Sequence, residues 1–143
     1  MLEARCSIRE HDPLRPLTAE QLGEFLYRAA RVRWSAEDGG QEVFDRPYPS
    51  GGRLHALELY PVVTQVTGLQ AAMYRYDPQQ HSLVRLPARE RPVQRLVSQA
   101  MAGVGSSTPP QVLILVAARF GATMWKYESI GYALLLKEAG VLF

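Results

Sequence analysis

The chain has little of what marks several common classes of protein. Cys6 is the only cysteine among 143 residues, so no disulfide can form within the chain and a reducing cytosol is the expected compartment. The 16 Lys and Arg residues nearly balance the 14 Asp and Glu residues, and this net charge of +2 demands neither a nucleic acid nor a membrane surface as partner. The three histidines, His11, His55 and His81, lie far apart and show no metal-ligand spacing, so no metal is expected.

Long apolar runs are missing as well. The longest, Val112 to Ala118, is far too short to span a bilayer, and Glu3 and Arg5 near the start argue against a signal peptide. The apolar fraction of 47% and the charged fraction of 21% are ordinary for a soluble globular protein. The length is that of one domain. We therefore expect a single cytoplasmic domain over residues 1–143 that mixes helices and strands.

The hydrophobic pattern predicts three main helices. Thr18-Ala19-Glu20-Gln21 is a capping box that opens the first, and its inner stripe is Leu22, Phe25, Leu26, Ala29 and Val32. Residues 92–102 form a second, amphipathic helix. The third begins at about Thr123 and is apolar on nearly every face.

Several apolar segments predict strands. Residues 57–66 read as a buried strand despite Pro61, and residues 73–76 and 82–86 alternate at period two around a turn, which is typical of a β-hairpin. Residues 111–120 show the continuous apolar pattern of a central strand covered on both faces. Residues 35–46 are polar and are expected to form a loop. Residues 47–52 predict a rigid turn into a short helix with Ser50 as its N-cap.

The end of the sequence is unusual because Gly140 is followed by three large apolar residues, Val141, Leu142 and Phe143. A helix that is apolar all round normally lies inside a larger core or in an oligomer interface. Two interpretations stay open: the chain dimerises through this helix, or it is the front part of a longer domain. We favour the second.

Lys126 and Tyr127 form the most informative pair in the sequence. Both side chains can carry protons, they follow Trp125, and they precede the apolar helix. Burial there would favour the neutral, basic form of the lysine. The alternative is a lysine that extends to solvent at a helix start beside a packed tyrosine.

Four motifs in order resemble one family. Arg5-Cys6-Ser7-Ile8-Arg9 resembles the Arg-Arg-Ser-x-Arg opening of FMN-dependent nitroreductase-fold enzymes. The other three resemble segments of the SagB/ThcOx-type dehydrogenases, the azoline oxidases of thiazole- and oxazole-modified peptide biosynthesis. These segments are residues 49–60 (PSGGRLHALELY), residues 73–83 (MYRYDPQQHSL) and residues 125–134 (WKYESIGYAL). Cys6 stands where the family usually has a second arginine, and Ala122 stands where an arginine often precedes Trp-Lys-Tyr. The family also continues beyond Phe143 with a helix, a flavin-contacting loop and a strand that wraps the partner subunit.

The resemblance implies a nitroreductase-like α+β fold whose central mixed or antiparallel sheet is flanked by helices, incomplete here at the C-terminus. It also implies FMN as cofactor. Arg5 and Arg9, with Cys6 and Ser7 between them, would meet the FMN phosphate, whereas the alternative is a solvated basic N-terminus. Pro49, Ser50, Gly51 and Gly52 would let the flat ring approach backbone, whereas the alternative is a plain tight turn.

The resemblance implies that Lys126 and Tyr127 are the catalytic pair. Aromatising a thiazoline or oxazoline removes a proton from one carbon and a hydride from the next, so the protein must supply a base. A homodimer, a cyclodehydratase complex and a precursor peptide are the expected partners. Two rivals stay open: a general NAD(P)H-dependent nitro or quinone reductase, which does not need Lys126, and a non-catalytic remnant or docking subunit.

Overall fold

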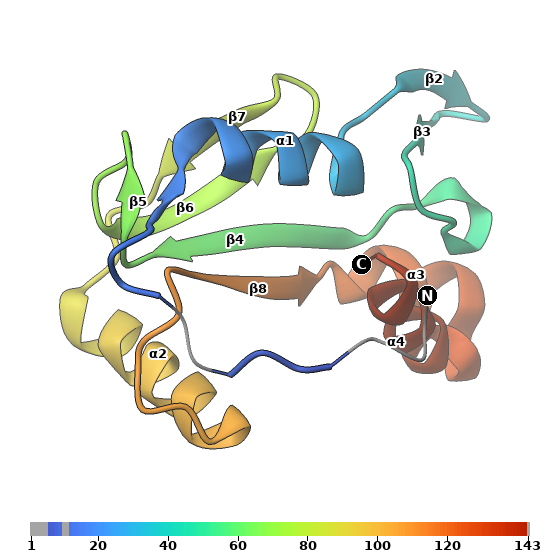
Figure 1. Ribbon diagram of the computed structural model, residues 1–143. Helices are drawn as coiled ribbons and strands as arrows, with labels where there is room; N and C mark the ends of the chain where they lie inside the picture. Colours follow the sequence, from blue (N-terminus) through green and yellow to red (C-terminus); the bar gives the residue numbers. More distant parts are fainter. Residues whose placement is uncertain (1–5, 10–11, 143) are drawn as a thin grey trace.

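A four-stranded antiparallel sheet forms the centre of the computed structural model, which describes residues 6–9 and 12–142 (Figure 1). Its strand order is β7-β6-β4-β8. β4 pairs along its whole length with β8, from Leu57 opposite Ala118 to Val63 opposite Val112. The strands are β4 (Leu57–Val63), β6 (Ala72–Asp77), β7 (Ser82–Arg85) and β8 (Val112–Ala118). β6 and β7 confirm the predicted hairpin.

Helices lie on both sides of this sheet, with α1 (Ala19–Ala30) above it and α2 (Glu90–Val104) below it in Figure 1. The predicted capping box opens α1: the Gln21 amide donates to Thr18 Oγ1 at 3.2 Å, and the Thr18 amide donates to Gln21 Oε1 at 3.0 Å. α1 buries Leu22 and Leu26 in the main core. Phe25 is half exposed and the helix ends before Val32, so these two were wrongly assigned to the inner stripe.

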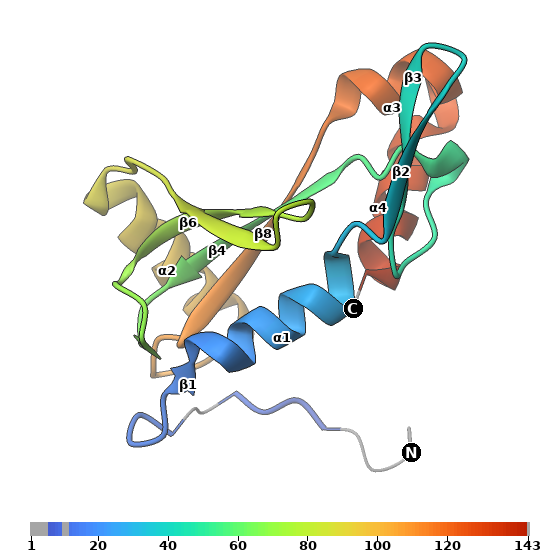
Figure 2. The same cartoon turned by 90° about the horizontal axis from the view of Figure 1, so that it is seen from above.

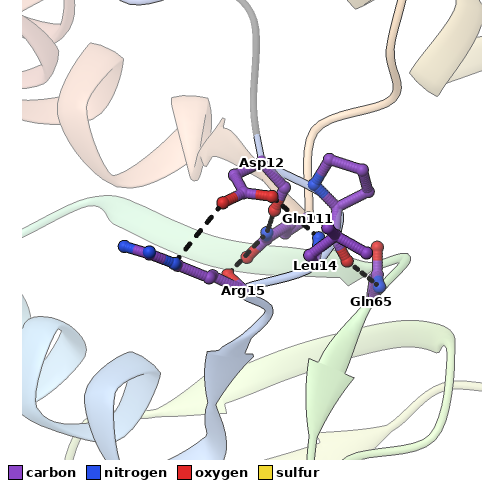
Figure 3. Close-up of polar contacts among 6 residues, drawn as sticks. Asp12, Leu14, Arg15, Gln65 and Gln111 are labelled. Atoms are coloured by element: carbon purple, nitrogen blue, oxygen red, sulfur yellow. Dashed lines mark hydrogen bonds and ion pairs between the residues drawn. The ribbon is translucent and has the colours of Figure 1, made fainter.

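The chain before α1 is tied to the end of the sheet at which β8 begins (Figure 3). Gln111 donates through Nε2 to the carbonyls of Asp12 at 3.0 Å and Arg15 at 3.1 Å, and Gln65 donates to the carbonyl of Pro13 at 2.9 Å. Next to these bonds, β1 (Leu17–Thr18) pairs in parallel with β5 (Val66–Thr67). These contacts fix where α1 starts.

Residues 34–45, expected to be mostly loop, form a second, two-stranded sheet. β2 (Trp34–Asp38) and β3 (Gln41–Asp45) pair around Gly39 and Gly40, whose φ angles of +58° and +79° suit a tight hairpin turn. Every residue of β2 is exposed. The loop prediction was wrong because a hairpin with little buried surface lacks the alternation of apolar residues that identifies strands in a sequence.

β8 lies at the edge of the sheet, so the prediction of a central strand was wrong for this chain. All its residues are half-buried or exposed, and Val116 is 38% exposed. A continuous apolar run indicates that both faces of a strand are suited to burial, but carries no information about pairing at its edges.

The predicted final helix is two helices, α3 (Phe120–Tyr127) and α4 (Gly131–Val141), joined by the 3₁₀ turn η3 (Glu128–Ile130). Glu128 has φ +42°, which breaks the helix. Much of the apolar surface is uncovered: Trp125 is 79% exposed, and Tyr132 and Leu136 are more than half exposed. None of the helices in the described part of the chain is long and apolar enough to cross a membrane.

Candidate functional site

Two of the sequence motifs meet in space. Residues 49–53, which contain the 3₁₀ turn η2 (Gly51–Arg53), lie beside α3 in both views (Figures 1 and 2). A Cβ atom built on Gly52 would stand 2.6 Å from Lys126 Nζ and 2.6 Å from Tyr127 Oη. One built on Gly51 would stand 3.4 Å from Cε2 of the Tyr127 ring. The glycine turn and the Lys-Tyr pair, 74 positions apart in sequence, therefore form one site.

Gly52 also makes room for the catalytic pair predicted from the sequence. The space that a Cβ atom of residue 52 would fill holds the ends of the Lys126 and Tyr127 side chains. Gly52 has φ +59°, a conformation that side chains disfavour. Glycine at this position thus lets the two proton-carrying groups reach the backbone of the turn.

Backbone strain is concentrated around this contact. Among the described residues, four non-glycine residues have positive φ, and three of them flank the site: Arg53 at +57°, His55 at +41° and Glu128 at +42°. The fourth is His81 in the β6–β7 hairpin. Strained backbone persists only where surrounding interactions hold it, and it is commonest at functional sites.

Ser50 holds the strained turn through its side chain. It occupies the N-cap position of η2 but makes no capping hydrogen bond there. Instead Ser50 Oγ accepts the amide of His55 at 2.8 Å and donates to Glu138 Oε2 on α4 at 2.8 Å. The predicted N-cap is therefore a link between the turn and the last helix.

A buried polar cluster lies beneath the turn. Arg46, Tyr48, His55 and Glu138 are each less than 9% exposed. Arg46 donates through Nη1 to Tyr48 Oη at 3.3 Å and to the Leu57 carbonyl at 3.4 Å. The rings of Tyr48 and His55 meet edge to face with centroids 5.0 Å apart.

Burial shifts the acid–base behaviour of this cluster. It lowers the pKa of His55 to about 4, and the positive charge of Arg46 adds to that effect. Burial also raises the pKa of Glu138, partly offset by the hydrogen bond from Ser50. Sequence reasoning missed the cluster. Its one signal was Glu138, a carboxyl group within a helix that is otherwise apolar on nearly every face.

Lys126 is exposed in this single chain, in contrast to the burial considered from the sequence. Its neighbour Trp125 points largely to solvent. Lys126 Nζ lies 5.9 Å from the centroid of the Tyr127 ring, so the pair are close neighbours. The expected desolvation of the lysine is not provided by the described part of the chain.

The N-terminal motif lies elsewhere. Arg5 is outside the described residues. Cys6, Ser7 and Arg9 are exposed, and Ser7 and Arg9 line a hollow of about 350 Å³ with the end of α2. In Figure 2 this segment runs well apart from α3 and α4. One chain therefore brings Pro49–Gly52 to Lys126 and Tyr127, but not Ser7 or Arg9. In the described part of the chain, no three His, Cys, Asp or Glu side chains are grouped so that they could hold a metal ion.

No protein-family model matches the chain. A curated relative, "Putative nitroreductase MJ1384" of Methanocaldococcus jannaschii, is 32% identical over 140 residues, which are 98% of this chain and 66% of that protein. The solved structure of a "putative nitroreductase" from Ralstonia eutropha JMP134 matches 99% of the chain and 58% of its own, with 27% identity and a TM-score of 0.71. The chain has the nitroreductase-like fold.

Two further solved structures agree with this. A "putative nitroreductase" from Anabaena variabilis ATCC 29413 matches 86% of the chain and 25% of its own, with 26% identity and a TM-score of 0.71. The Escherichia coli microcin synthetase McbBCD complex with truncated pro-MccB17 bound matches 99% of the chain and 54% of its own, with 22% identity and a TM-score of 0.68. These similarities support placement in the nitroreductase-like superfamily. The chain spans less than two thirds of the length of each of these proteins.

Proposed function

We propose that this chain carries part of the active site of an FMN-dependent oxidoreductase that dehydrogenates peptide thiazolines or oxazolines to thiazoles or oxazoles. The observation that carries the proposal is the convergence of Lys126 Nζ and Tyr127 Oη on Gly52. Two groups able to exchange protons are thereby held at a strained glycine turn, which is a typical arrangement for catalysis. The similarity to a chain of a microcin synthetase complex with a bound peptide supports a peptide substrate.

In this proposal Lys126 removes the acidic proton of the azoline ring. Tyr127 helps to direct the transfer of that proton, because its hydroxyl and the amine of Lys126 both lie at Gly52. FMN, when bound, supplies the acceptor for the hydride. The backbone of Pro49, Ser50, Gly51 and Gly52 lies at the pair and fits a role in holding the ring of the cofactor.

Arg5, Cys6, Ser7 and Arg9 are proposed to hold the phosphate of FMN. Ser7 and Arg9 are far from the glycine turn in one chain, so we propose a homodimer whose site draws on both copies. A second copy that covers the exposed surface of α3 would also exclude water from Lys126. A cyclodehydratase complex and a precursor peptide remain the proposed partners, in the cytoplasm.

The first experiment is to add FMN to the purified chain and to follow flavin fluorescence and absorbance. A yellow protein that retains FMN after desalting is expected. A protein that stays colourless would remove both enzymatic interpretations and leave a docking subunit.

The second experiment compares Lys126→Ala with Lys137→Ala in azoline oxidation. These are the two lysines of the chain, and Lys137 is exposed on α4. Loss of a positioned general base lowers the rate by about 10² to 10⁴. We expect that loss only for Lys126→Ala, with FMN still bound. An equal rate in both variants would contradict the base assignment.

A second candidate function is a general flavin-dependent reductase of nitro compounds or quinones. The 32% identity to a protein named as a nitroreductase favours it. In that case NAD(P)H would be oxidised with a nitroarene or quinone as acceptor, and Lys126→Ala would retain the wild-type rate.

A further inference from the structure

We propose that Glu138 is a positioning residue for the Lys126–Tyr127 pair and that it acts through Ser50. Its catalytic meaning rests on the function proposed above, but the structural link can be tested without any cofactor. Glu138 comes from α4, whereas the turn it holds precedes β4, 88 residues earlier in the chain. The hydrogen bond therefore joins α4, the helix that follows Lys126 and Tyr127 in the sequence, to the glycine turn against which these two side chains lie.

Two hydrogen bonds in series, here called the relay, run from the amide of His55 to Ser50 and from Ser50 to Glu138, so Glu138 is the final acceptor. The backbone amide of His55 donates to Ser50 Oγ at 2.8 Å. The single hydroxyl hydrogen of Ser50 is therefore free to point at Glu138 Oε2, also at 2.8 Å. Ser50 needs an acceptor at this position, and Glu138 supplies it.

The relay acts on the most strained part of the site. His55 has φ +41°, with its amide bonded to Ser50 and its carbonyl bonded to Arg119 Nη2 at 3.3 Å. Between Ser50 and His55 lies Gly52, the residue that contacts Lys126 and Tyr127. Release of the Ser50 side chain would remove one of the two hydrogen bonds made by the backbone of His55. Gly52 would then move relative to the pair.

Burial of the Glu138 side chain lowers the stability of the fold. The residue is 7% exposed, and its Oε1 atom has no hydrogen-bond partner among the described residues. A buried carboxyl group with an unsatisfied oxygen lowers the stability of a fold. The Ala56 amide and the charges of Arg46 and Arg119 favour its ionised form, and the bond from Ser50 ties it to the turn.

The test uses amide hydrogen exchange of the cofactor-free chain. The variants are Glu138→Ala, Ser50→Ala, their double mutant and Glu138→Gln, whose amide oxygen still accepts a hydrogen bond. Loss of a side-chain hydrogen bond corresponds to up to ~10-fold in a local opening equilibrium. We expect exchange in residues 51–55 to rise ~10-fold in each alanine variant and no further in the double mutant. Glu138→Gln should match the wild type, and α1 should be unchanged in all variants.

Additive effects in the double mutant, or equal effects of Gln and Ala at position 138, would overturn the link. A general rise that includes α1 would show a purely structural role and would also overturn the proposal. Lys137→Ala, an exposed neighbour on the same helix, should leave residues 51–55 unchanged. If Glu138→Ala does not fold, a rise in Ser50→Ala together with wild-type exchange in Glu138→Gln supports the link, and wild-type exchange in Ser50→Ala overturns it.

The positioning role has its own readout, the rate at which acetic anhydride modifies Lys126 relative to an added lysine peptide. We expect the Ser50→Ala and Glu138→Ala variants to change this rate to the same extent, and Glu138→Gln to restore it. An unchanged rate would mean that the turn does not control the pair. If the wild type proves active, kcat of azoline oxidation should fall in the alanine variants and recover in Glu138→Gln. A wild type without that activity would refute the proposed function, while the exchange and acetylation results would still stand.

Discussion

Replacement of Gly52 by alanine is the sharpest test of the candidate site. The new methyl group would lie 2.6 Å from Lys126 Nζ and from Tyr127 Oη, whereas ordinary contacts begin at 3.4 Å. The two groups must therefore retreat by about 0.8 Å. Lys126 has a flexible chain and can move easily, but Tyr127 Oη stands at the end of a rigid ring.

Two separate effects follow. The φ angle of +59° costs about 1–2 kcal/mol in stability once a side chain is present. A displacement close to 1 Å at reacting groups costs on the order of 10²-fold in rate. Gly52→Ala should therefore be modestly destabilised and should lose about two orders of magnitude in azoline oxidation.

Gly105→Ala is the matched control. Gly105 closes α2 with φ +69° and has nothing within 4 Å of a built Cβ atom, so this variant isolates the backbone effect. Urea unfolding should show a similar loss of about 1–2 kcal/mol in both variants, with activity lost only in Gly52→Ala. Acetylation of Lys126, measured against Lys137, should rise in Gly52→Ala alone. Equal acetylation and equal activity in both variants would refute the proposed contact.

Two other predictions concern stability. Burial lowers the pKa of His55 from 6.5 to about 4, so His55 of the unfolded chain takes up a proton at a higher pH than His55 of the folded chain. The folded state is therefore at its full stability above pH 6.5, and it loses about 3 kcal/mol of unfolding free energy as the pH falls to 4. The difference in unfolding free energy between wild type and His55→Gln should shrink by that amount between pH 7.5 and pH 4, and a constant difference would contradict the lowered pKa. In α4, a Cβ atom on Gly131 would lie 2.8 Å from Met124 Sδ, so Gly131→Ala should lose about 1–3 kcal/mol by overpacking. Gly140→Ala, with nothing within 4 Å, should gain up to about 1 kcal/mol from helix propensity, and thermal unfolding that ranks the two variants in the opposite order would refute this.

Local features of the fold were predictable because they depend on neighbouring residues. The capping box at Thr18 and the hairpin of β6 and β7 were confirmed, since turn chemistry and side-chain alternation act over a few residues. The hairpin of β2 and β3 was missed because its strands bury little apolar surface. The break at Glu128 was missed because it depends on how α3 and α4 pack, with Gly131 against Met124.

The candidate site, too, was predictable from the sequence only in part. Lys126, Tyr127 and the Pro49–Gly52 turn were selected from the sequence, and their roles remain proposals. The sequence did not predict that Gly52 would contact both groups, or that Ser50 would bond to Glu138 instead of capping its own helix. Those contacts join residues 74 to 88 positions apart, and no local pattern records them.

The sequence by itself determined the residue types available for proton transfer, the helix and strand segments with clear periodicity, and the resemblance that pointed to a flavin. The first two follow from composition and from interactions within a few residues, whereas the flavin is what the resemblance of four motifs to a known family implies. Only the tertiary structure decided that the glycine turn lies against the Lys-Tyr pair, while Ser7 and Arg9 lie at the far end of α2. The physical reason is that the β4–β8 pairing and the packing of α4 under the turn bring distant segments together. Such pairings depend on the whole chain at once.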